Sequence, residues 1–147
     1  MKGMLAILAG VIVIDQVTKA TARVLLASQS WYAGPVGLVL ATNSGVAFGL
    51  FGGSWWVIPL NVVLGAVVAS AFVSALRHKE SCLARGLLLV LGGFVGNLVD
   101  RICFGKVTDF LWIRGWSVFN IADCSVVAGS IIVGLALLFP GPTKSHG

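Results

Sequence analysis

The chain has 147 residues, of which 58% are hydrophobic and only 10% are charged. Soluble domains usually carry about 25% charged residues, so this composition excludes a soluble globule and indicates an integral membrane protein of one domain, residues 1–147. The net charge of +5 comes from scattered Lys and Arg residues without interleaved aromatic residues, so we expect no nucleic acid partner.

Four segments are long and apolar enough to cross a bilayer, which takes about 20 residues. They are 4–26, 56–76, 84–104 and 119–139. The first segment also fits a cleavable signal peptide, because Lys2 precedes an apolar run. Asp15 and Lys19 count against this alternative, since they fall where the apolar run should meet the cleavage site. Their i, i+4 spacing instead suits a pair on one face of a membrane helix.

The connection between the first two segments, residues 27–54, contains no charged residue. Residues 36–42 favour a strand, and Asn43-Ser44-Gly45 follows as a turn signal. We therefore expect a small β structure on the membrane surface, formed largely by this connection. Large apolar side chains near its end suit either contact with acyl chains or an aromatic belt at the interface. They are Phe48, Leu50, Phe51, Trp55 and Trp56.

Basic residues indicate which side of the membrane each connection faces. They are concentrated near both termini and between the second and third segments, as Lys2, Arg77, Lys79, Arg85 and Lys144. Cytoplasmic connections are enriched in Lys and Arg, so we expect both termini in the cytoplasm and residues 27–54 and 105–118 outside. Lys106 and Arg114, in the second outer connection, are exceptions to this pattern.

Four of the five acidic residues are expected toward the outer ends of the helices, namely Asp15, Asp100, Asp109 and Asp123. A charge at the centre of a membrane helix costs about 2.5–3.5 kcal/mol, so intramembrane acids are functional candidates. Polar neighbours accompany three of them at helical spacing, in the sets Asp15–Lys19, Asn97–Asp100–Arg101 and Asn120–Asp123. Alternatively, these sets only hold helices together through polar contacts.

Asp109 and Asp123 differ from the other aspartates, since neither has an adjacent cation and both flank the same outer connection. Two carboxyl groups at close range resist ionising together, so one keeps its proton. The ionised group can then take a proton from water while the other donates to a carbonyl oxygen. This pair predicts hydrolysis of an amide bond without a metal, another cofactor or a covalent intermediate.

Five motifs occur in one order along the chain, and on them the chain resembles bacterial lipoprotein signal peptidase, or signal peptidase II. They are DQVTK (15–19), NSGVAFG (43–49), GGFVGNLVDR (92–101), VTDF (107–110) and FNIAD (119–123). The resemblance implies an all-α membrane protein of four transmembrane helices with a small extracytoplasmic β-cradle. Such a protein lies in the bacterial cytoplasmic membrane with its site near the outer face. It cuts lipid-modified prolipoproteins just before the diacylglyceryl-modified cysteine. We also expect the protein to contact membrane lipid and to be a monomer.

The resemblance also implies roles for single residues. Asp109 and Asp123 match the catalytic pair of this aspartic peptidase family, and Asp100 matches a supporting residue. Further positions that shape or support the site are Asp15, Lys19, Asn43, Gly45, Asn97, Arg101 and Asn120. We expect Arg101 to orient a backbone carbonyl or to balance the charge of the pair. The chain departs from the family pattern at Thr108, where Val is usual, at Cys124, and in its short connection from Asp109 to Asp123.

Two other classes of function compete with the peptidase. The aspartates suit the ion sites of a small proton-coupled carrier, but such carriers often have paired halves and this chain has no internal repeat. A non-catalytic assembly factor would use the polar residues only to fix helix packing. Cleavage of a lipidated prolipoprotein in detergent separates all three.

Overall fold

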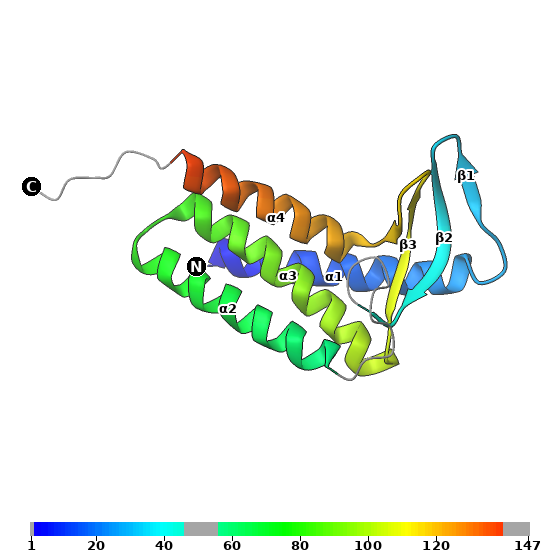
Figure 1. The fold of residues 1–147 in the computed structure, drawn as a ribbon, viewed down its shortest axis with the longest axis horizontal. Coiled ribbons are helices and arrows are strands. Elements are labelled where there is room, and N and C mark those ends of the chain that lie inside the picture. Colours follow the sequence, from blue (N-terminus) through cyan, green and yellow to red (C-terminus); the bar gives the residue numbers. More distant parts are fainter. Residues whose placement is uncertain (1, 46–55, 140–147) are drawn as a thin grey trace, which may run out of the picture.

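The computed structural model describes residues 2–45 and 56–139, and it places four long helices beside a small sheet (Figure 1). The helices are α1 (Lys2–Leu25), α2 (Val57–Arg77), α3 (Ser81–Phe104) and α4 (Ile121–Leu138). Each is long and apolar enough to cross a membrane, which confirms the four predicted spans. The expectation for Phe48, Leu50, Phe51 and Trp55 falls outside the described residues.

Helix α3 lies at the centre of the bundle and packs against α1, α2 and α4. It is the most buried of the four helices, and glycines allow its backbone to approach α4 closely. A Cβ atom added at Gly129 on α4 would lie 2.6 Å from the carbonyl oxygen of Gly86 on α3. Small residues at such contacts are how helices gain van der Waals packing in lipid, where no hydrophobic force joins them.

Replacing Gly129 by Ala is therefore expected to destabilise the bundle by about 1–3 kcal/mol, the usual cost of overpacking. Gly134→Ala is the matched control on the same helix, because a Cβ atom there meets nothing within 4 Å. Thermal unfolding of both variants in detergent measures the difference. An equal unfolding temperature for the two variants would contradict the close contact between α3 and α4.

The sheet is antiparallel, with strands in the order β1-β2-β3-β4. The strands are β1 (Trp31–Ala33), β2 (Val36–Asn43), β3 (Val107–Ile113) and β4 (Val118–Phe119). Strand β2 confirms the prediction for residues 36–42. The connection between α3 and α4 also contributes two strands, which the sequence did not reveal. Val107, Thr108, Asp109 and Phe110 are all buried, so β3 lacks the alternation of buried and exposed residues that identifies a strand.

Strand β3 joins the sheet to the helices. It pairs with β2, where Asp109 lies opposite Ala41 and Val107 lies opposite Asn43. Phe110 packs on Ala22 and Leu26 at the end of α1. The sheet thus lies at one end of the bundle, while the start of α1 and the turn between α2 and α3 lie at the other (Figure 1).

Candidate active site

Polar side chains are buried where the sheet meets the helices. Among the described residues, the largest fully buried side chains are Lys19, Asn120, Asp15 and Asp100. Burying a charge or an amide is costly unless it is paired and hydrogen-bonded. These polar groups therefore lie together, although most of the chain is apolar. Their partners come from α1, α3, β3 and α4.

Lys19 holds the α1 side of this cluster. Its Nζ atom lies 2.8 Å from Asp15 Oδ2 and 3.7 Å from Asp100 Oδ2, and it donates a 2.9 Å hydrogen bond to Asn97 Oδ1. The other oxygen of Asp15 accepts a 2.9 Å hydrogen bond from the backbone N–H of Ala122, at the first turn of α4. The predicted pair Asp15–Lys19 therefore forms, and it ties α1 to both α3 and α4.

Asp100 takes its nearest cation from α1 rather than from its own helix. Asp100 Oδ1 lies 3.0 Å from a terminal nitrogen of Arg23, and Asp100 Oδ2 accepts a 2.8 Å hydrogen bond from the backbone N–H of Thr108. Arg101 follows Asp100 directly, and adjacent residues of a helix do not share a face. Arg101 instead donates to the carbonyl oxygen of Gly45 at 2.8 Å.

Asn120 connects Asp109, on β3, with Asp123, in the first turn of α4. As the N-cap of α4 it forms a capping box, in which its Oδ1 accepts from the Asp123 N–H at 2.9 Å and its own N–H donates to Asp123 Oδ2 at 3.1 Å. Its Nδ2 atom donates to Asp109 Oδ1 at 2.7 Å. One buried asparagine therefore donates to both carboxyl groups. The side-chain amide of Asn120 donates to Asp109, and the backbone N–H of Asn120 donates to Asp123.

Asn97 completes this network from α3. Its Nδ2 atom donates to Asp123 Oδ1 at 2.9 Å, while its Oδ1 atom accepts from Lys19 and from Asn120. Both oxygens of Asp123 thus accept from N–H groups, which suits a carboxylate. The fixed amides hold Asp123 in one orientation.

Asp109 has the environment of a carboxyl group that retains its proton near neutral pH. Burial, and secondarily the nearby Asp123 carboxylate, raise the pKa of Asp109 to about 7, against the smaller opposing effects of Asn120, Lys19 and Arg101. The side chain nevertheless reaches an open cavity of about 290 Å³, which is lined by Ala41, Thr42, Asn43, Ser44, Asp109, Ser117 and Val118. This volume holds several water molecules, at roughly 30 Å³ each.

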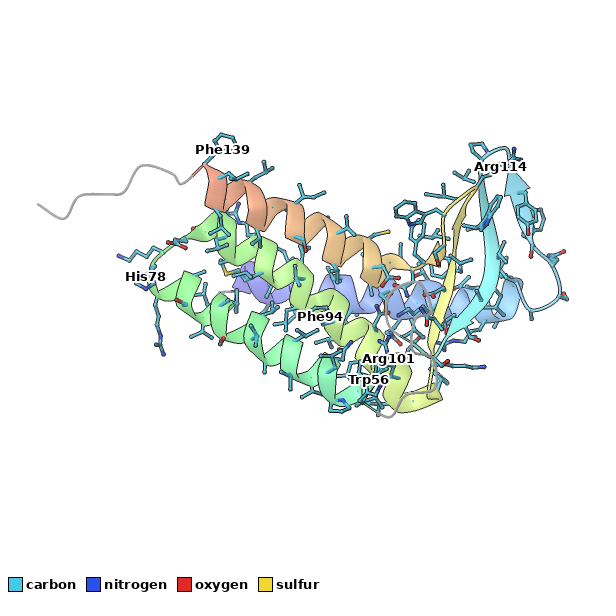
Figure 2. The ribbon with its side chains drawn as sticks, in the orientation of Figure 1. Trp56, His78, Phe94, Arg101, Arg114 and Phe139 are labelled. Atoms are coloured by element: carbon cyan, nitrogen blue, oxygen red, sulfur yellow. The ribbon has the colours of Figure 1, made fainter. Side chains whose placement is uncertain are left out.

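The structure brings together most of the residues that the sequence predicted for the site. Asp15, Lys19, Asn97, Asp100, Asp109, Asn120 and Asp123 form one hydrogen-bonded network. Arg101 links it to the turn after β2, where the Gly45 N–H donates to Asn43 Oδ1 at 2.8 Å. Figure 2 shows Arg101 at the end of α3 near the sheet, with His78 and Phe139 at the opposite end.

Three partners were missed by the sequence analysis, namely Gln16, Arg23 and Thr108. Gln16 donates to Asp15 Oδ2 and to the Gly96 carbonyl oxygen, both at 3.0 Å. Arg23 continues the spacing of Asp15 and Lys19 by another four residues, so the helical period could have identified it. For Thr108 no such local signal exists, because its partners come from α1, α3 and the N-cap of α4.

No group of three or more His, Cys, Asp and Glu side chains within residues 2–45 and 56–139 is arranged to hold a metal ion. The carboxylates of the cluster instead contact ammonium, guanidinium and amide groups. The cavity beside Asp109 can hold water next to a carboxyl group whose pKa is raised.

Comparison with known proteins gives one consistent family. The sequence model described as Signal peptidase (SPase) II matches residues 7–139. A lipoprotein signal peptidase of Mycobacterium leprae is 40% identical, over 92% of this chain and 71% of that protein. The lipoprotein signal peptidase of Pelotomaculum thermopropionicum is 37% identical, over 90% of this chain and 89% of its own. A solved bacterial membrane enzyme, 24% identical, superposes with a TM-score of 0.79 over 100% of this chain and 94% of that chain, which shows the same fold.

Proposed function

Since this chain belongs to the signal peptidase II family, and is thus a hydrolase that removes signal peptides from prolipoproteins, we propose that Asp109 and Asp123 activate the water that cleaves the peptide bond. The hydrogen bonds of Asn120 to both aspartates carry this proposal. They support a fixed relation between the two carboxyl groups, of which Asp109 lines a cavity that admits water.

The environments of the two carboxyl groups suggest a division of labour. Asp123, with both oxygens accepting from N–H groups, is the base that takes a proton as the oxygen of water attacks the carbonyl carbon. Asp109, which is about half protonated at pH 7 because its pKa is about 7, donates its proton to the carbonyl oxygen. When the C–N bond breaks, the leaving nitrogen takes the proton from Asp123, and the hydroxyl proton of the collapsing intermediate returns to Asp109.

The same proposal gives the peptide bond that is cut and the position of that bond across the membrane. The chain is a multi-pass bacterial membrane protein, and the basic residues Arg77, Lys79 and Arg85 lie at the end of the bundle away from the sheet. From the positive-inside rule we infer that both termini lie in the cytoplasm and the aspartates near the outer face. We infer that a membrane-anchored prolipoprotein is cut there, immediately before its diacylglyceryl-modified cysteine, by a monomer.

The direct experiment compares two forms of one prolipoprotein, with and without the diacylglyceryl group, as substrates of the purified protein in detergent. We expect cleavage of the lipidated form, with a mass for the product that begins at the modified cysteine. Equal cleavage of both forms, or a product that begins at another residue, would refute the proposed site of cleavage. An absence of cleavage by folded protein would refute the proposed function.

The pH dependence of kcat/KM tests the role of Asp109. A carboxyl group is protonated below its pKa, so the donor form of Asp109 is lost as the pH rises through about 7. We therefore expect kcat/KM to fall about tenfold per pH unit above this value, with a midpoint that belongs to the coupled pair. The folded fraction at each pH, measured by circular dichroism, serves as the control. A rate that stays constant from pH 6 to pH 9 would contradict this assignment.

A further inference from the structure

Arg23, in the last turn of α1, contacts residues of two other elements, α3 and β3. One terminal nitrogen lies 3.0 Å from Asp100 Oδ1 on α3, and Nε donates a 2.9 Å hydrogen bond to Thr108 Oγ1 on β3. Its guanidinium carbon lies 4.0 Å from the centre of the Phe104 ring, a distance at which a cation and an aromatic face attract. The planar guanidinium thus joins α1 to the end of α3 and the start of β3, which follow each other in the chain but lie 77 and 85 residues from Arg23 at Asp100 and Thr108.

Thr108 is held at three points and directly precedes Asp109. Its hydroxyl accepts from Arg23, its backbone N–H donates to Asp100 Oδ2 at 2.8 Å, and its carbonyl oxygen accepts from Asn120 Nδ2 at 3.4 Å. Asp100 contacts Arg23 with one oxygen and β3 with the other. Arg23, Asp100 and Thr108 therefore form a closed ring of contacts at the start of the strand that carries Asp109.

Helix α1 does not depend on Arg23 for its place in the bundle. Asp15 bonds to the Ala122 N–H of α4, while Gln16 and Lys19 bond to Gly96 and Asn97 of α3. Among the described residues, in contrast, Arg23 is the partner of the Thr108 hydroxyl. Of these hydrogen bonds made by α1, the one from Arg23 to Thr108 is the one that reaches β3.

We propose that Arg23 is a positioning residue, which acts through Asp100 and Thr108 to fix the start of β3 so that the Asp109 carboxyl group meets Asn120. This inference rests on the proposed function of Asp109 and adds a residue to it. Thr108 matters because a hydroxyl accepts the Nε–H of Arg23. A valine at this position would leave that donor without its acceptor on β3.

Kinetics of Arg23→Gln, Thr108→Val and the double variant test this role. A misplaced group on a strand costs up to about a hundredfold in rate, so we expect kcat of Arg23→Gln, per folded molecule, to fall about 10- to 100-fold. KM should stay within about twofold, because Arg23 does not line the cavity beside Asp109. The double variant should be no slower than Arg23→Gln, since both substitutions remove the same hydrogen bond between Arg23 and Thr108. Arg23→Lys keeps the positive charge but lacks the planar guanidinium group that contacts two partners at once. Its kcat should lie between those of the wild type and Arg23→Gln.

Arg114→Gln is the matched control, because it removes the same charge from an exposed position at the far tip of the sheet (Figure 2). Its kcat should equal that of the wild type. An Arg23→Gln variant with wild-type kcat, or a double variant slower by the product of the two single effects, would overturn the proposal.

The pH profile separates positioning from loss of charge or of stability. The charges that act on Asp109 come from Asp123 on α4, Lys19 on α1 and Arg101 on α3, and all three remain in Arg23→Gln. A loosened β3 admits water to Asp109, so the fall in kcat/KM should begin at a lower pH than in the wild type. Loss of a positive charge alone would raise the pKa of Asp109 and so shift the fall in kcat/KM to a higher pH. Lower stability alone would leave the pH of this fall unchanged. Either result overturns the proposal.

The aspartate variants keep this test distinct from the test of the proposed function. If Asp109→Asn retains turnover, the proposed chemistry fails whatever Arg23 does. If Asp109→Asn is inactive while Arg23→Gln has an unchanged kcat and pH profile, only the positioning role fails.

Discussion

Asp109→Asn and Asp123→Asn are each expected to reduce the rate of prolipoprotein cleavage by about 10⁴-fold or more, because an amide neither takes a proton from water nor donates a carboxyl proton. Asparagine has nearly the shape of aspartate, and its side-chain oxygen can still accept the 2.7 Å hydrogen bond that Asn120 donates to position 109. The loss for Asp109→Asn should therefore appear in the chemical step and not in folding, whereas Asp123 accepts hydrogen bonds with both oxygens, so asparagine there turns its NH₂ toward one N–H donor.

The stability of Asp109→Asn relative to the wild type shows whether a loss of cleavage reflects lost chemistry or lost folding. The pKa of Asp109 is about 7 in the folded protein, above the value near 4 of an unfolded aspartate. Between these values the folded state binds more protons, so stability falls as the pH rises toward 7. Above pH 7 the wild type bears the full cost of this buried charge, whereas Asp109→Asn does not. The variant should therefore be at least as stable as the wild type at pH 8.

Single-turnover cleavage, followed by mass spectrometry, is the measurement that resolves such a large loss. Glu80→Gln is the matched control, since Glu80 is the acidic residue in the turn between α2 and α3, away from the site. It should retain full activity. If either asparagine variant cleaves within about tenfold of the wild-type rate, the pair does not perform the chemistry.

Lys19→Met is expected to destabilise the folded protein by about 3–5 kcal/mol, the usual cost of leaving a buried charge without its partner. Lys19 and its contacts Asp15 and Asp100 have fully buried side chains. Asp100 keeps Arg23 as a partner, so the uncompensated charge falls mainly on Asp15. The double variant Lys19→Met/Asp15→Asn removes both charges and should recover part of this loss.

Unfolding by SDS in mixed micelles, followed by circular dichroism, compares these variants. Lys106→Met serves as the control for loss of one lysine, because Lys106 is exposed in the turn before β3. A loss of less than about 1 kcal/mol for Lys19→Met, or a double variant less stable than Lys19→Met, would show that Lys19 does not hold the buried charges together.

Hydropathy and local spacing made much of this structure predictable. The four spans follow from long apolar segments, since a bilayer selects for length and composition that a window of sequence already contains. Asp15 and Lys19 could be paired because residues four apart share a helix face. Strand β2 follows a similar local rule. The polar start of α4 was visible as a set, but its capping box depends on the backbone of that turn.

The sequence by itself determined that this is a four-span membrane protein, and through its motifs it pointed to the signal peptidase II family. Only the tertiary structure decided which polar groups meet. Arg23 pairs with Asp100 across 77 residues, and Asn120 reaches Asp109 on a strand that is buried on both faces. Such contacts have no local signature, because each arises where α1, α3, β3 and α4 converge and a buried donor must find an acceptor.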